Sequence, residues 1–246
     1  MNNLWKYIII ATAIVLSAVV LSTAYTQRYR TATGTITVTG LGETEFTSDL
    51  IIVKGRISVE NFNAAEGYRE MDNDRTKVIN FIKSHGITEE SISFAMLSHN
   101  ETYNSVYQDG KYIGEEFDGY SLTQEFTIES KDIDAVESVA RELTSLLADG
   151  INISVYEPMY FYSDLNTLKL DLIASAAADA RSRAELIATN SGAELGALTW
   201  SSAGVFQITA ATGDEEFSAG GAFNLSSREK KARVTVRAEY KIKNKQ

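Results

Sequence analysis

The feature that most constrains the fold of this chain is a run of 19 uncharged residues near its N-terminus. The run extends from Tyr7 to Tyr25 and reads YIIIATAIVLSAVVLSTAY. A helix needs about 20 apolar residues to cross the roughly 30 Å hydrocarbon core of a bilayer. Trp5, Tyr7 and Tyr25 are aromatic residues of the kind that anchor such a helix at both membrane interfaces. The sequence therefore predicts one membrane-spanning helix that folds apart from the rest of the chain.

Two alternatives to an uncleaved anchor are a cleaved signal peptide and a buried core helix. Ser22, Thr23 and Ala24 are small residues that suit a signal peptidase, but the run is longer than the usual h-region of roughly 7–15 residues. A core helix would normally have a polar stripe, and the few Ser and Thr residues here are scattered around the helix. The signal-anchor is the favoured interpretation, and cleavage stays open.

The predicted organisation follows from this segment. We expect a cytoplasmic N-terminus over residues 1–6, a signal-anchor over 7–25, a linker over 26–34 and an extracytoplasmic domain over 35–243. The basic residues that flank the run are nearly balanced, so the positive-inside rule alone does not orient it. The acidic domain that follows favours an outward orientation, which predicts a single-pass inner-membrane anchor with a periplasmic domain.

Charge and composition exclude several classes of function. Beyond residue 30 the chain carries 33 acids and 20 bases, a formal charge of −13. Such a domain repels phosphate backbones, so nucleic acid is not an expected partner, and binding of the domain face to anionic lipid is disfavoured. The chain has no cysteine, which rules out thiol catalysis and sites that need cysteine ligands.

The remainder of the chain predicts an α+β fold, with antiparallel sheets and helices packed on one face, in the order β-β-α-β-β-α-β-α-β-β. The clearest strand is 230–243, where apolar and charged residues alternate. Asp109-Gly110 predicts a hairpin turn between strands over 91–107 and 112–129. Further expectations are a strand that ends at the turn Gly40-Leu41-Gly42, a strand over 194–211, a mobile loop over 213–227, and helices over 64–83, 132–147 and 165–190.

The predicted helix over 165–190 is rich in alanine. Its alanines are Ala174, Ala176, Ala177, Ala178, Ala180, Ala184 and Ala188. Small residues allow a helix to lie close to a sheet or to another helix, so we expect the helix to have a tightly buried face.

Several short motifs resemble those of the SIMPL-domain family of YggE-like periplasmic and envelope proteins. The stretch ITVTGLGE at 36–43 resembles the opening strand of that family, AADARSRAE at 177–185 resembles its A-x-x-D-A-R-x-[KR]-A-E helix, and GAELG at 192–196 resembles its G-x-x-L-G turn. The resemblance covers roughly residues 35–243. It implies an envelope protein linked to oxidative-stress defence that forms large homo-oligomers, and it implies no catalytic residues.

No group of residues predicts a catalytic, cofactor or metal site. His85 and His99 are the only histidines, and His85 lies at a helix C-terminus, where a capping role is expected. Ser227 and Lys230 fit the pattern S-x-x-K, but its companion motifs are missing. Two acidic clusters, at 115–118 and 214–216, do not follow a calcium-binding pattern and are interpreted as solvated loops.

Aromatic residues provide the one candidate interaction site, because they bury large areas at low entropic cost. The candidate interface residues are Tyr103, Tyr107, Tyr112, Tyr156, Tyr160, Phe161 and Tyr162. Packing within the sheet is the alternative role for these rings. The favoured hypothesis is a non-enzymatic, self-associating envelope protein. The alternative is an extracytoplasmic binding module for a small ligand or a partner protein, with loop 213–227 as a lid.

Overall fold

The computed structural model describes residues 4–30, 34–212, 218 and 220–244, and the expected domain consists of two compact units. Unit 1 comprises residues 1–43, 170–205 and 233–246, and unit 2 comprises residues 44–169 and 206–232. Three long elements contribute residues to both units, namely β1 (Thr35–Thr47), α4 (Leu165–Asn190) and β10 (Glu229–Asn244). The predicted α+β class with antiparallel sheets is confirmed, and each unit is described by itself.

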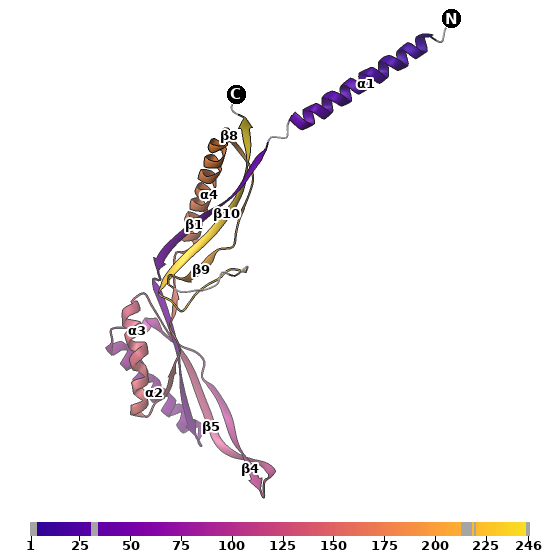
Figure 1. Ribbon diagram of the computed structural model, residues 1–246. Coiled ribbons are helices and arrows are strands. Elements are labelled where there is room, and N and C mark those ends of the chain that lie inside the picture. The colour runs from indigo at the N-terminus through magenta and orange to yellow at the C-terminus, as the bar shows by residue number, and fades with distance from the viewer. Residues whose placement is uncertain (1–3, 31–33, 213–217, 219, 245–246) are drawn as a thin grey trace. The chain divides into compact units, whose positions relative to one another are not determined.

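Unit 2 is built on an antiparallel six-stranded sheet whose central strand is β2 (Figure 1). On one side β2 pairs with β5, and on the other side it pairs with β6 and β7. β5 in turn pairs with β3 and β4. The strands are β2 (Leu50–Asn61), β3 (Ile92–Phe94), β4 (Ser98–Gln108), β5 (Lys111–Ser130), β6 (Asn152–Val155) and β7 (Met159–Phe161).

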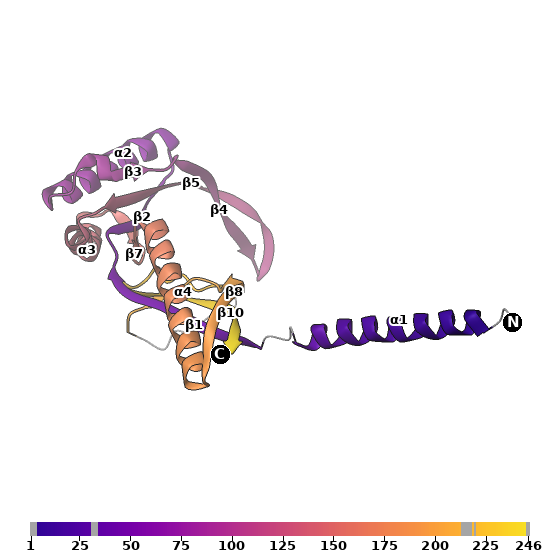
Figure 2. The same cartoon turned by 90° about the horizontal axis from the view of Figure 1, so that it is seen from above.

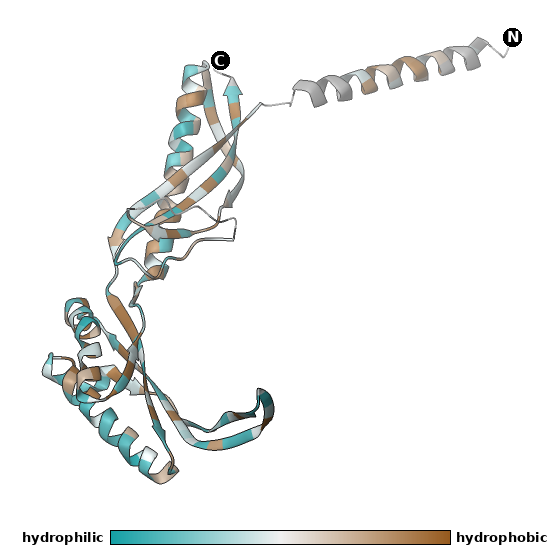
Figure 3. Ribbon diagram, turned by 60° about the horizontal axis from the view of Figure 1, so that its bottom comes forward, coloured by the Kyte–Doolittle hydropathy of each residue, from teal (hydrophilic) through white to brown (hydrophobic). Residues whose placement is uncertain are grey.

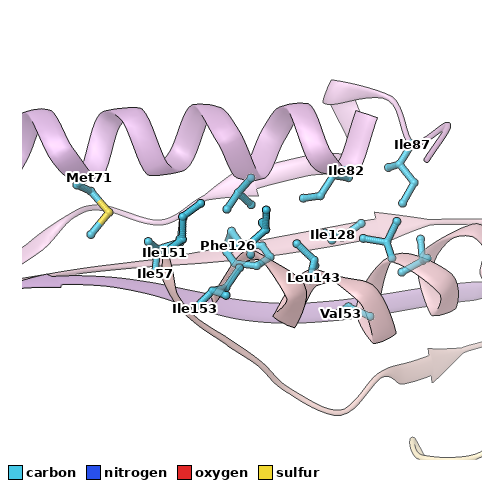
Figure 4. Packing of buried hydrophobic residues seen from close by; sticks show 14 of the residues in the cluster. Val53, Ile57, Met71, Ile82, Ile87, Phe126, Ile128, Leu143, Ile151 and Ile153 are labelled. Atoms are coloured by element: carbon cyan, nitrogen blue, oxygen red, sulfur yellow. The ribbon is translucent and has the colours of Figure 1, made fainter. Parts of the chain in front are cut away.

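The core of unit 2 lies between this sheet and the helices α2 (Ala64–Ser84) and α3 (Ile133–Glu142). Alternate residues of β2 are buried on the face that the helices cover, while Lys54 and Arg56 between them are exposed. Figure 4 shows Met71 and Ile82 of α2 directed toward Ile57 and Phe126 of the sheet. Burying a side chain of this size contributes about 1.5–3 kcal/mol. The predicted placement of helices on one face is therefore confirmed.

Local signals define the ends of α2 as the sequence predicts. The side chain of Asn63 accepts hydrogen bonds from the N–H groups of Ala65 and Glu66, which caps the first turn. Gly86 follows the helix with φ of +87°, a left-handed conformation that suits glycine and ends the helix. A short 3₁₀ turn, η1 (Glu89–Ser91), then leads into β3.

In unit 1, antiparallel β10 lies between β1 and β8 (Ala193–Ala203), and the part of α4 in this unit runs beside these strands (Figure 2). The buried cluster comprises Val38, Ala180, Ala184, Ala238 and Tyr240. Hydrophobic and hydrophilic residues alternate along β10, as Figure 3 shows by colour. The sheet therefore has one face against α4 and one polar face, as the alternation predicts. Strand β9 (Gln207–Ala210), which also pairs with β10, belongs to unit 2.

The predicted turn at Gly40-Leu41-Gly42 is wrong, because β1 continues through it to Thr47. The glycines instead allow α4 to approach the strand. A Cβ atom on Gly40 would lie 2.1 Å from the carbonyl oxygen of Ala176, and one on Gly42 would lie 2.2 Å from that of Leu172. Both distances are far shorter than any van der Waals contact, so only glycine fits at these two positions.

The alanine face of α4 is buried as expected. Ala176, Ala180, Ala184 and Ala188 have no exposed surface. The helix extends from Leu165 to Asn190, as the sequence predicts.

Two long strands are interrupted where the sequence predicts continuity. The strand expected over 91–107 divides into β3 and β4 at residues 95–97, and the buried side chain of Gln124 donates a hydrogen bond to the carbonyl of Ala95 (2.9 Å). The strand expected over 194–211 divides into β8 and β9, and the N–H of Gly204 donates to the carbonyl of Thr235 (2.7 Å). Both breaks depend on partners far away in the sequence.

The helix predicted over 132–147 changes form partway along its length. The α-helix ends at Glu142 and a 3₁₀ helix, η2 (Leu143–Asp149), follows. A 3₁₀ helix has about three residues per turn. Leu146 is therefore buried three residues after Leu143, while Leu147 is 53% exposed.

The loop predicted over 213–227 is described only at 218 and 220–227, and residues 213–217 and 219 lie outside the described residues. The described part is tied to neighbouring strands of unit 2. Ile208 exchanges backbone hydrogen bonds with Ala222 and Asn224, and the N–H of Tyr160 donates to the carbonyl of Leu225 (2.8 Å). Backbone groups of Ala222, Asn224 and Leu225 are therefore paired with β7 and β9.

The N-terminal run lies in a 27-residue helix, α1 (Leu4–Arg30). The described side chains of this helix are all exposed, among them Ile14, Leu16 and Val20. A search of the described residues finds no helix with the combined length and hydropathy of a membrane span.

The fit between β1 and α4 yields a first prediction. Gly40→Ala should lower the free energy of unfolding by about 1–3 kcal/mol or more, because the new methyl group meets backbone atoms that cannot rotate away. Urea unfolding of the full chain, followed by circular dichroism, measures the change. Gly220→Ala is the matched control, since its Cβ would meet only the Ser218 hydroxyl at 3.8 Å. Equal stability of the two variants would contradict the proposed packing.

Candidate functional site

A group of exposed aromatic residues lies on a two-stranded hairpin formed by β4 and β5. β5 pairs with β2 from Tyr120 onward, so its residues 111–119 extend past β2 and pair with β4 (Figure 1). Asp109 and Gly110 connect the strands, both with positive φ, as the sequence predicts for a tight hairpin turn. We call residues 99–120 the β4–β5 arm.

One face of the β4–β5 arm carries an aromatic stripe made of Tyr103, Tyr107, Tyr112, Phe117 and Tyr120. Residues 103 and 107 are four apart on β4 and therefore share a face. Their cross-strand partners are Phe117 and Tyr112, with ring centroids 5.8 and 5.9 Å apart. The ring of Tyr120 lies 5.3 Å from that of Phe117 and extends the stripe toward the sheet.

The aromatic stripe is open to solvent rather than packed within the fold. Tyr103, Tyr107 and Tyr112 are 51%, 64% and 56% exposed, and Phe117 is 40% exposed. The hydroxyl of Tyr103 donates a hydrogen bond to Glu101 (2.5 Å), and this bond raises the pKa of Tyr103. Acidic residues surround the stripe, since the arm carries five acids and one lysine.

Of the other four candidate aromatic residues, Tyr160 and Phe161 lie in β7, and Tyr156 and Tyr162 directly follow β6 and β7, at the opposite edge of the six-stranded sheet. Tyr160 is partly buried, and its hydroxyl donates to Glu137 of α3 (2.7 Å). Burial first and this hydrogen bond second raise the pKa of Tyr160 to about 12. The guanidinium of Arg56 lies 5.9 Å from the ring centroid of Tyr156. Tyr156 and Tyr160 thus already make contacts within unit 2.

The two remaining members of this group, Phe161 and Tyr162, are also partly buried. The ring of Tyr162 packs edge-on against Phe46, with centroids 4.9 Å apart. The structure therefore separates the seven predicted residues into the exposed arm group and an edge group, in which Tyr156 is exposed and the other three are partly buried. Sequence reasoning missed Phe117, whose cross-strand pairing with Tyr103 follows a register shift that alternation alone does not show.

A shallow cleft of about 390 Å³ lies beside the edge group. Its lining residues are Glu137, Ala140, Arg141, Thr144, Val155, Tyr156, Glu157, Pro158 and Tyr160. Glu137 already accepts the Tyr160 hydroxyl and lies 3.9 Å from the guanidinium of Arg141. The cleft thus offers aromatic surface and charges of both signs, which suits a small polar ligand better than an apolar one.

His85 caps α2, as the sequence predicts. One ring nitrogen bonds the carbonyl of Phe81 (2.9 Å), and the other lies 3.1 Å from the carboxylate of Glu142. The Phe81 carbonyl and then Glu142 raise the pKa of His85. His99 lies on β4, opposite Leu122, and is exposed. Across the described ranges, no three or more His, Asp or Glu side chains gather closely enough to hold a metal ion.

Ser227 and Lys230, the other candidate pair, help to fold the chain before β10. The buried ammonium of Lys230 donates to the carbonyl of Asn224 (2.6 Å), and the N–H of Ser227 donates to the side chain of the same asparagine (2.9 Å). The acidic residues 115–118 lie on the exposed arm, whereas the second acidic cluster, 214–216, lies outside the described residues.

The Asp-Ala-Arg motif of α4 has a structural role in unit 1. The carboxylate of Asp179 accepts a hydrogen bond from the backbone N–H of Leu41 (2.8 Å) and pairs with Arg183 (2.9 Å). The Leu41 N–H and then Arg183 lower the pKa of Asp179. Two residues further along the helix, Arg181 pairs with Glu185 (2.9 Å). The motif therefore joins the helix to β1 at the position of the two glycines.

Comparison with known families agrees with these motifs. Residues 36–240 match the family model SIMPL, described as a protein of unknown function (DUF541). The match includes both β1 and the α4 motif, and it confirms the resemblance seen in the sequence. A comparison with curated proteins gives no match for the chain.

The contacts of His85 predict a pH-dependent stability. A raised pKa means that the folded state binds the proton more tightly than the unfolded state, whose value is about 6.5. The stabilising contribution is therefore complete below that pH and is lost as the pH rises through the folded value. As the pH rises from about 5 to about 8, the free energy of unfolding of the wild type, measured with denaturant, should fall more than that of His85→Gln. His99→Gln should keep the wild-type dependence of stability on pH. The same dependence in His85→Gln would contradict the stabilising role of the His85 contacts.

Proposed function

Because this chain belongs to the SIMPL family, whose description assigns no activity, we propose a function from the surface of the molecule. The protein is a non-enzymatic component of the cell envelope that is held at the inner membrane by its N-terminal helix. It self-associates through the β4–β5 arm and supports envelope integrity and oxidative-stress defence. The stress-related part rests on the family resemblance alone.

The aromatic stripe is the observation that carries the proposed self-association. A two-stranded hairpin is marginally stable in water, and this arm nevertheless exposes four large aromatic residues on one face. Aromatic side chains of this kind act as anchors when a partner surface covers them. If a partner surface covered the aromatic stripe, the arm would become more stable and the contact would contribute to the affinity between the two surfaces.

The charge of the arm restricts how two copies can meet. With five acids and one lysine, the arm carries a formal charge of −4. Two such arms facing each other would repel. We therefore infer a heterologous contact, in which the arm of one copy binds a different surface of the next copy.

The proposed anchor rests on the sequence of residues 7–25 and on the exposure of α1. A helix whose described side chains are all exposed, and most of them apolar, is expected to be covered by lipid or by another protein. The extracytoplasmic location of the domain follows from this anchor and from the acidic composition of the remaining chain.

A ligand-binding module is the second candidate, and the cleft at the edge group favours it. The N–H of Tyr160, which lines the cleft, donates to the carbonyl of Leu225. Arg228 also pairs with Asp134 of α3. The segment expected to act as a lid is thus fastened at its C-terminal end to elements that form the cleft.

Self-association predicts assembly at protein concentrations of tens of micromolar. Replacing Tyr103, Tyr107, Tyr112 and Phe117 with serine should weaken assembly by at least about 30-fold, because a single anchor residue contributes about 2 kcal/mol. Light scattering after size exclusion of the full chain in mild detergent measures the change. The matched control is Phe62→Ser with Tyr68→Ser, two aromatic residues exposed outside the arm. A monomeric wild type, or equal assembly of both variants, contradicts the proposal and favours the binding module.

The anchor predicts that α1 remains attached and resists extraction from membranes by alkaline carbonate. Val15→Lys should release the protein, because a lysine near the centre of a spanning helix costs about 2.5–3.5 kcal/mol. Val205→Lys, at an exposed valine outside α1, serves as the control. N-terminal sequencing of the membrane-bound protein completes the test. A mature chain that begins near Ala24 would show that the segment is a cleaved signal peptide.

A further inference from the structure

Although the chain as a whole is acidic, its C-terminal strand is strongly basic. Residues 230–246 contain seven basic residues and one acid, a formal charge of +6 in a chain whose net charge is −10. Nearly all of this segment belongs to β10. The expectation that the domain face avoids anionic surfaces therefore fails to describe β10.

The fold directs these charges away from the core of unit 1. Val234, Val236, Ala238 and Tyr240 are buried on the face that α4 covers. Arg237, Lys241 and Lys243, which we call the basic row, alternate with them and are exposed. The basic row therefore lies on the face of the sheet opposite α4. Hydrophilic and hydrophobic residues alternate along β10 in Figure 3.

A tryptophan from the adjacent strand lies on the same face. Trp200 of β8 is the cross-strand partner of Glu239 and is 50% exposed. Two acids accompany the basic row, since Glu239 lies within it and Glu194 is the partner of Lys243. Arg233, nearer the start of β10, pairs with Glu43. The C-terminal part of the face thus combines three exposed cations, two acids and one large aromatic ring.

Chain connectivity places this end of β10 close to the end of α1. The N–H of Ile242 donates a hydrogen bond to the carbonyl of Gly34 (2.9 Å). Residue 34 follows Arg30, the last residue of α1, by four positions, and four residues span at most about 15 Å. Lys241 and Lys243 are therefore tethered within a short distance of the point where α1 ends.

We propose that the basic row and Trp200 form a surface that binds the anionic phospholipid headgroups of the bilayer that holds α1. An anionic membrane attracts basic side chains within about one Debye length, roughly 8–10 Å, which the tether allows. Tryptophan prefers the headgroup region because its ring is apolar and its N–H is polar. This inference rests on the proposed membrane anchor and adds a lipid preference to it.

The test uses the full chain with Trp5→Phe, which leaves Trp200 as its only tryptophan. The protein is reconstituted into vesicles of phosphatidylcholine, or of phosphatidylcholine and phosphatidylglycerol in equal parts, each with a spin-labelled headgroup as quencher. We expect stronger quenching of Trp200 in the anionic vesicles. The difference should disappear at about 1 M salt, where the Debye length falls to about 3 Å.

Charge variants test the role of the basic row. The triple variant Arg237→Gln/Lys241→Gln/Lys243→Gln should bind the anionic headgroups more weakly. Its association constant should fall about 100-fold, at roughly fivefold per basic residue. The matched control replaces Lys54, Lys83 and Lys131, three exposed lysines of unit 2 outside the β4–β5 arm, with glutamine. Circular dichroism of both variants verifies that they fold. Only the control should retain the difference in quenching between the two kinds of vesicle.

The outcomes separate this inference from the anchor on which it rests. If the protein does not float with phosphatidylcholine vesicles, the anchor itself fails. If it floats but Trp200 is quenched equally in both kinds of vesicle, the anchor stands and the headgroup-binding surface is overturned. If the basic-row variant and the control variant both lost the difference in quenching between the two kinds of vesicle, the headgroup-binding surface would also be overturned. The net charge of the chain, rather than the basic row, would then explain the difference.

Discussion

Unit 1 depends on the close approach of α4 to β1. A Cβ atom on Gly40 or on Gly42 would lie within 2.2 Å of a carbonyl oxygen of the helix, so backbone packs directly against backbone. The helix can come this close only because its facing residues are alanines without exposed surface, such as Ala176 and Ala180. Larger side chains on either element would force the two apart and leave the interface poorly packed. The basic face of β10 lies on the other side of this sheet, and so depends on that packing.

The same interface explains why the family signature is recognisable and yet indicates no activity. Asp179 accepts a hydrogen bond from the N–H of Leu41 and pairs with Arg183, while Ala180 and Ala184 of the motif belong to the buried cluster that also contains Val38 of β1. Each of these signature residues in α4 thus has a role in joining helix to strand. A signature of this kind identifies a fold, and function must be argued from surfaces. In this chain the surfaces that stand out are the aromatic stripe and the basic row.

Much of the secondary structure follows from the sequence, and the errors have a common cause. Local signals were sufficient for α4, for the glycine that ends α2 and for the Asp109-Gly110 turn. The predicted turn at Gly40-Leu41-Gly42 failed because glycine serves there to admit a helix from elsewhere in the chain. The break after β3 likewise depends on Gln124, a buried partner on another strand. Glycine and glutamine at such positions have no local pattern that reveals their partner.

By itself, the sequence determined the α+β class, the alternation of buried and exposed residues, and the presence of aromatic residues near a hairpin. These properties follow from periodicity and turn chemistry, which are local. Only the tertiary structure decided that the seven candidate aromatic residues separate to opposite edges of one sheet, and that the end of β10 is bonded to Gly34. Strand pairing brings together residues that are far apart in the sequence, and the order and register of that pairing are set by packing across the whole sheet.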